Sequence, residues 1–139
     1  MRTSKDEHEA AVHFSERYRQ PSGKALKQLE RLVLGADFGG NGYTTVAQAR
    51  LLGERLNLGP NSRLLDIGAG RGWPGLFLAK TTGCAVVLTD LPMDAMRRAQ
   101  ERARKEALRE RTGGVVASAR RLPFRQETFD AIVHTDVLC

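Results

Sequence analysis

The sequence has 139 residues, 41% hydrophobic and 27% charged, which is enough for one globular domain with a sizeable core. Its formal charge of +6 and pI near 9.9 raise the question of an acidic partner. No uncharged stretch approaches the roughly 20 residues of a membrane-spanning helix. The charged residues within 1–10 are unlike a signal peptide. We therefore expect a cytoplasmic protein without a membrane partner.

The first part of the chain is predicted to be helical. Apolar residues at helical spacing predict one helix over 6–19 and a second after Ser22, whose hydroxyl can cap it. A loop must follow at 35–42, because this stretch holds four glycines. Residues 45–57 then predict a third helix, which Asn57 and the glycine and proline after it would end.

Strands and helices alternate in the rest of the chain. Short apolar runs predict strands at 63–67, 84–89, 115–117 and 129–134, and helical patterns at 74–82 and 92–111. This order is typical of an α/β fold, a doubly wound parallel sheet with helices on both faces.

The basic residues and the cysteines are both better explained by structural roles than by binding sites. Much of the positive charge lies in the predicted helix at 92–111, whose solvated face accounts for it, and few aromatic residues are interleaved with these charges. A nucleic-acid partner is therefore only an alternative. Cys84 and Cys139 lack the spacing of a metal site, so no metal is expected, and Cys84 is predicted to be a buried free thiol.

The most informative segment is Asp66-Ile67-Gly68-Ala69-Gly70-Arg71-Gly72. It places an acid and three alternate glycines where a strand would turn into a helix, which brings the backbone close to a ligand. Two ligand classes use such a turn. Dinucleotides use G-x-G-x-x-G, and the register from Gly70 to Gly75 matches that string. The other class is S-adenosylmethionine (SAM).

The acids favour SAM over a dinucleotide. Asp66 would face the pyrophosphate of a dinucleotide, and like charges disfavour each other, whereas SAM carries an ammonium and a sulfonium. Asp90 directly follows the second predicted strand, so both acids should lie at the same edge of the sheet. Asp90 can accept hydrogen bonds from ribose hydroxyls, which NAD and SAM share, so an NAD-binding module stays the alternative.

Three segments resemble class I SAM-dependent methyltransferases, in the family's order and spacing. Residues 64–72 resemble the first motif, 86–91 the second, and Leu122-Pro123-Phe124 with 129–134 the later segment. The resemblance implies a Rossmann-like SAM-binding domain at 44–139 with strand order 3-2-1-4. It also implies a helical cap segment at 1–43.

The resemblance also implies which residues hold the cofactor. In the family, an acid at the position of Ser118 contacts the adenine amino group, and a hydroxyl is a weaker acceptor than a carboxylate. Ala119 could offer its backbone N–H to adenine, Leu91 would pack on the ring, and Tyr43 would close over SAM. The implied cofactor-binding residues are Asp66, Gly68, Ala69, Gly70, Gly72, Asp90, Leu91, Ser118, Ala119 and Tyr43.

Methyl transfer from a sulfonium depends mainly on alignment, and a base is needed only if the acceptor must lose a proton. His134 and Asp136 are the candidate bases, because they lie at the end of the fourth predicted strand. In a doubly wound sheet the first and fourth strands flank the point where the winding reverses, and ligands bind there. A contact of His134 with SAM without proton transfer is the alternative. The cap segment favours a small-molecule acceptor.

The predicted sheet ends after its fourth strand, close to Cys139. We therefore expect a truncated form of a longer methyltransferase, with weak or no activity alone. A short protein that self-associates through the fourth strand, whose edge would be exposed, and a non-catalytic SAM-binding protein are the alternatives.

Overall fold

The computed structural model describes residues 4–39 and 42–137. Three helices come first, α1 (Lys5–Arg19), α2 (Lys24–Leu34) and α3 (Val46–Arg55). The remaining elements alternate: β1 (Arg63–Ile67), α4 (Gly75–Thr82), β2 (Ala85–Asp90), α5 (Met93–Lys105), the 3-10 helix η1 (Arg109–Arg111), β3 (Thr112–Val116) and β4 (Ala131–Val133). Each predicted helix and strand is present, with shifted boundaries.

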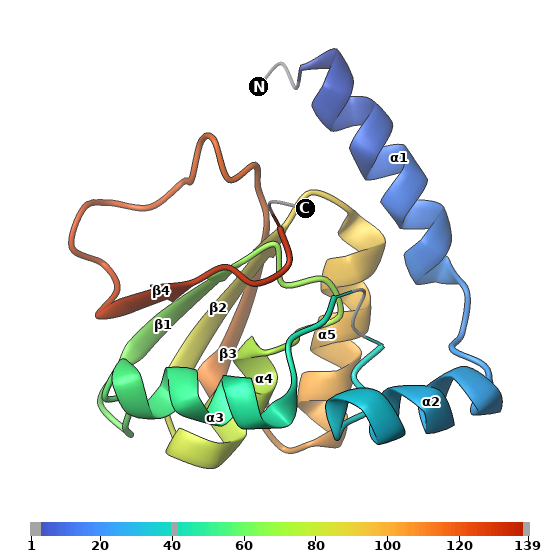
Figure 1. Ribbon diagram of the computed structural model, residues 1–139. Helices are drawn as coiled ribbons and strands as arrows, with labels where there is room; N and C mark the ends of the chain where they lie inside the picture. Colours follow the sequence, from blue (N-terminus) through green and yellow to red (C-terminus); the bar gives the residue numbers. More distant parts are fainter. Residues whose placement is uncertain (1–3, 40–41, 138–139) are drawn as a thin grey trace.

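The four strands form one parallel sheet in the order β3-β2-β1-β4, which confirms the predicted topology (Figure 1). Leu64 of β1 pairs with Val86 of β2 and with Ala131 of β4. Leu64 is fully buried and Val86 nearly so. Because the strands are parallel, their carboxyl ends meet at one edge of the sheet, beyond which α1 rises in Figure 1.

Helices cover one face of the sheet in the described part of the chain. A Cβ on Gly75 of α4 would meet the side chains of Asp66 and Leu88, and a Cβ on Gly114 would meet Gln100 of α5, so both helices pack on this face. On the opposite face Ile132 is 54% exposed. The sequence predicted helices on both faces, so this expectation is wrong for residues 4–39 and 42–137.

Two predicted helix ends are wrong for local reasons. The basic helix ends at Lys105 instead of 111, because Ala107 adopts a left-handed φ of 57° and Leu108 N donates to the Ala103 carbonyl at 2.7 Å. Gly23, not Ser22, is the N-cap residue of α2. The Ser22 hydroxyl instead accepts a hydrogen bond from Arg71, which begins the attachment of the N-terminal helices to the glycine turn.

Arginines join the N-terminal helices to the rest of the molecule. Arg71 donates to the backbone carbonyls of Arg17 and Gln20 as well as to Ser22. Arg98 of α5 donates to the Arg19 carbonyl at 2.9 Å. These contacts hold the end of α1 against both the glycine turn and α5, next to the carboxyl edge of the sheet.

Candidate functional site

The glycine turn depends on its glycines. Gly68, Gly70 and Gly72 adopt φ of 68°, 54° and 96°, which L side chains rarely adopt. A Cβ on Gly68 would also lie 2.5 Å from Val137, and one on Gly70 would lie 2.8 Å from the Tyr18 hydroxyl. The alternate glycines predicted as a ligand-binding turn are therefore required by the backbone and by two neighbouring segments.

Asp66 is buried at the start of this turn, with 1% of its surface exposed. Its Oδ2 accepts a hydrogen bond from the backbone N–H of Gly75 at 2.8 Å. Burial raises the pKa of Asp66 well above its usual value, and the nearby charge of Asp90 raises it further. The Asp66 carboxyl group thus accepts the first N–H of α4, and burial disfavours its ionised form.

Asp90 lies at the carboxyl end of β2, beside the end of β1, as the sequence predicted. Its Oδ2 accepts from Gly70 N and its Oδ1 accepts from Leu91 N, each at 2.8 Å. Burial raises the pKa of Asp90 despite these two bonds. Since each carboxylate oxygen has two lone pairs, Asp90 can still accept from a ligand.

Two neighbouring cavities, which we call the trough, lie between α1 and the carboxyl edge of the sheet. The first has a volume of about 330 Å³ and includes Gly68, Ala69, Gly70 and Asp90 in its lining. The second, of about 550 Å³, includes Leu91 and Ser118. Because Asp90 and Leu91 are consecutive and α1 lines both cavities, the trough can take an elongated ligand.

The other predicted site residues lie in several places. Asp136 lines the first cavity and accepts from Thr44 N and Oγ1 at 3.2 and 2.8 Å. His134 and Ala119 have exposed positions after β4 and β3. Tyr43 is 82% exposed and lines an adjoining groove. Gly72 is buried, and a Cβ there would lie 2.5 Å from Leu76.

Sequence reasoning missed the residues that α1 contributes to the trough, and Arg71 of the turn. Glu7, Phe14 and Tyr18 of α1 line it, as does Arg71. Trp73, which the sequence left open between lining the pocket and covering the sheet, lines the first cavity. The pair Ser4 and Glu7 has the spacing of a capping box, which is readable from sequence and is present in the structure. Apart from the cap segment at 1–43 that the family resemblance implies, nothing local in the sequence indicates that α1 folds over the sheet edge.

Trp73 links the turn to the segment before α3. Its indole N–H donates to the Thr44 carbonyl at 3.0 Å, and its ring packs on Phe38 and Phe77 with centroids 4.8 and 5.4 Å away. Arg102 of α5 lies over the Phe38 ring at 3.7 Å. The wall of the first cavity is therefore fixed by a packed aromatic group.

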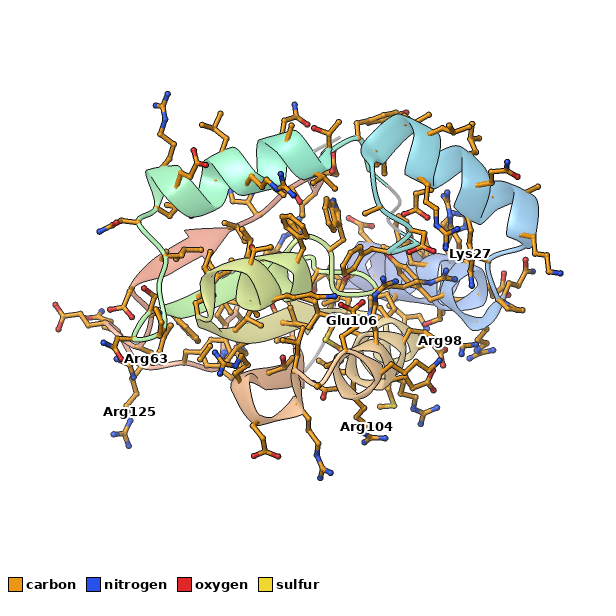
Figure 2. The ribbon with its side chains drawn as sticks, turned by 90° about the horizontal axis from the view of Figure 1, so that it is seen from below. Lys27, Arg63, Arg98, Arg104, Glu106 and Arg125 are labelled. Carbon is orange, nitrogen blue, oxygen red and sulfur yellow. The ribbon has the colours of Figure 1, made fainter. Side chains whose placement is uncertain are left out.

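Internal contacts engage part of the positive charge of α5. Arg98 forms an ion pair with Glu101, and Arg102 pairs with both Glu106 and Asp37. Figure 2 shows Arg104 extending outward from α5. These pairings weaken the nucleic-acid alternative, because they remove cations from a continuous basic face.

The described residues lack two kinds of feature, a metal-binding cluster and a membrane-spanning helix. In residues 4–39 and 42–137, no group of three or more His, Cys, Asp or Glu side chains could hold a metal ion. Within the same ranges no helix is long and apolar enough to cross a membrane. Cys84 is a buried free thiol, as predicted.

Residues 64–139 match the family model described as a methyltransferase domain. The chain belongs to this methyltransferase family. It is 35% identical over 79 residues to the methyltransferase GfsG of Streptomyces halstedii, covering 57% of this chain and 28% of that protein. It is 28% identical over 135 residues to the sterol 24-C-methyltransferase of Clavispora lusitaniae, covering 93% of this chain and 31% of that enzyme. This methyltransferase chain thus spans less than a third of either relative.

Solved structures show the same fold. The geranyl diphosphate C-methyltransferase of Streptomyces coelicolor A3(2), solved with Mg²⁺, geranyl diphosphate and S-adenosyl-L-homocysteine, superposes with a TM-score of 0.71. The match covers 96% of this chain and 54% of that one, at 17% identity. The Rossmann-like fold of the methyltransferase chain, including the N-terminal helices, therefore has a solved counterpart.

Proposed function

We propose that this methyltransferase chain binds SAM in the trough and belongs to an enzyme that methylates a small molecule. One observation carries the proposal: Asp66 and Asp90 accept the N–H groups of Gly75 and Gly70, the donors that a pyrophosphate would need. Of the two carboxyl groups, Asp90 lines the first cavity and can meet a ligand directly, whereas Asp66 lies buried behind the turn. SAM supplies an ammonium, a sulfonium and two ribose hydroxyls, all of which suit carboxylates.

The proposed roles run from the first cavity of the trough, which receives the amino-acid part and ribose of SAM, to the second, which receives the adenine. Gly68, Ala69 and Gly70 leave backbone space for the amino-acid part of SAM, while Asp66 supports its ammonium through the turn. Asp90 accepts from the ribose hydroxyls, and Leu91 with Ser118 and the N–H of Ala119 receives the adenine. SAM supplies an activated methyl group when bound, and the residues of the chain orient it and exclude water.

The proposed acceptor is apolar. A groove of about 490 Å³ adjoins the first cavity, and its lining includes Leu26, Leu29 and Tyr43. Arg17, Gly42 and Arg71 line both spaces, so the groove opens beside the proposed methyl donor. Sterol and geranyl diphosphate methyltransferases, as their names say, act on molecules with large apolar parts, which supports this choice.

Proton transfer is proposed for the segment after β4. Asp136 lines the first cavity and is the better-placed base, whereas His134 would serve only if it turned toward the acceptor. The same proposal includes a cytoplasmic location and a cap segment at 1–43. It also includes self-association through β4, whose Ile132 is 54% exposed.

Isothermal calorimetry of the 139-residue chain tests the proposal. We expect S-adenosylhomocysteine to bind and NADH not to bind, with Asp90→Ala abolishing the heat. Asp130→Ala, which removes an exposed carboxylate that accepts from Arg63 N, should leave binding unchanged. Binding of NADH without S-adenosylhomocysteine would establish the dinucleotide alternative. A steep salt dependence of DNA binding would favour the nucleic-acid alternative.

A further inference from the structure

A carboxylate from α1 reaches the second cavity of the trough. Glu7 is half-buried, and its Oε1 accepts a hydrogen bond from the hydroxyl of Ser118, a residue 111 positions away that is only 5% exposed. Ser118 Oγ also accepts from Arg120 N at 3.1 Å. The single proton of Ser118 is thus directed at Glu7, and a ligand in this cavity meets the Glu7 carboxylate as the charged acceptor.

The two oxygens of Glu7 have separate partners. Its Oε2 accepts from Ser4 N at 3.0 Å, which completes the capping box of α1. The cap uses only this oxygen, so it does not explain why Oε1 points to Ser118. Hydrogen bonds from Ser118 and Ser4, together with the charge of Arg120, lower the pKa of Glu7, so it is ionised and can only accept at neutral pH.

The surroundings of Glu7 fit a purine. Leu91 and Val116 offer apolar surfaces for the faces of a ring, and both line the cavity with Glu7. The lining also includes His8, Arg120 and Arg121. A carboxylate at the edge of a ring accepts from an exocyclic amine and repels a carbonyl oxygen. This chemistry separates adenine from hypoxanthine.

We propose that Glu7 selects the adenine of the cofactor by accepting a hydrogen bond from its exocyclic amine, either directly or in concert with Ser118. The proposal rests on SAM binding in the trough as proposed above. Glu7 thus provides from α1 the charge that the sequence lacks at Ser118. It also makes α1 part of the cofactor site rather than only a cover over it.

The test compares two ligands that differ at one position. Calorimetry would use S-adenosylhomocysteine and S-inosylhomocysteine, in which a carbonyl replaces the exocyclic amine. The wild-type chain should bind the adenine ligand on the order of tenfold more tightly. Glu7→Gln keeps an acceptor for Ser4 N and therefore the cap, but its amide can also donate to a carbonyl. This variant should remove or invert the preference.

Matched variants separate recognition from folding. Glu9→Gln removes an exposed carboxylate of the same helix, paired with Lys5 at 3.8 Å, and should keep the preference. Adding Ser118→Asp to Glu7→Gln should restore the preference. If Glu7→Gln weakens both ligands equally, Glu7 only caps α1 and the proposal is overturned. If the wild-type chain binds neither ligand, the proposed function itself fails. That result differs from equal weakening in Glu7→Gln, because there the wild-type chain still binds.

Discussion

Replacing Asp66 by Asn should stabilise the free protein while weakening its cofactor site. Asp66 is 1% exposed and accepts one backbone N–H, from Gly75. Asn has nearly the same shape and keeps an acceptor for that N–H, but it carries no charge. Burial disfavours the ionised form of Asp66 and so raises its pKa, and a pKa difference of one between folded and unfolded chains corresponds to about 1.4 kcal/mol.

The effect must depend on pH in a defined direction. A carboxyl group with a raised pKa in the folded state holds its proton there to higher pH than in the unfolded chain. Its contribution to stability is therefore lost as the pH rises from about 4 through the raised pKa. Asp66→Asn should match the wild type at pH 4. At pH 7 its free energy of unfolding should be higher by about 1–3 kcal/mol, or roughly 3–12 °C in melting temperature.

Urea unfolding followed by circular dichroism between pH 4 and pH 8 measures this difference. Asp130→Asn is the matched control, because Asp130 is exposed yet also accepts a backbone N–H, from Arg63 at 2.7 Å. It should show no gain at neutral pH. If Asp66→Asn lowers the free energy of unfolding equally at all pH values, the charge of Asp66 is not the source of strain and the reasoning is refuted.

Three further predictions concern ligand binding and association. Binding of S-adenosylhomocysteine should release protons, because its ammonium and hydroxyls favour the ionised forms of Asp66 and Asp90. Calorimetry in buffers of different ionisation enthalpy measures the number of protons released. Proton uptake on binding would contradict this prediction. Gly70→Ala should abolish that binding and lower the free energy of unfolding by about 1–3 kcal/mol, since φ is 54° there. Gly59→Ala, where a Cβ meets nothing within 4 Å, is the control and should bind normally. Ile132→Lys should reduce self-association in light scattering, and a monomeric wild type would contradict this expectation.

The fold was predictable because its signals are local. Most strands contain a short apolar run, although β3 begins with Thr112 and two glycines, and each helix has an apolar stripe or a capping residue, as Thr45 shows for α3. The glycine turn was predictable for the same reason, since the positive φ values of Gly68, Gly70 and Gly72 need that residue type. The helix end at Ala107 was not, because a left-handed alanine carries no sequence signal.

The candidate site was predictable only where the sheet determines it. Parallel pairing puts Asp66 and Asp90 at one edge whatever the rest of the chain does. The contribution of α1 depends instead on long-range contacts such as those of Arg71 with Gln20 and of Ser118 with Glu7. These contacts join segments about 50 and 110 residues apart, so no spacing rule could reveal them.

The position of Trp73 gives the protein a built-in optical reporter. It is the only tryptophan in the sequence, it is 7% exposed, and it lines the first cavity. Selective excitation of the indole ring therefore samples this one wall of the site. A ligand that enters the cavity changes the surroundings of the ring directly. Binding and local unfolding of the turn can thus be followed by intrinsic fluorescence, without a label and without turnover.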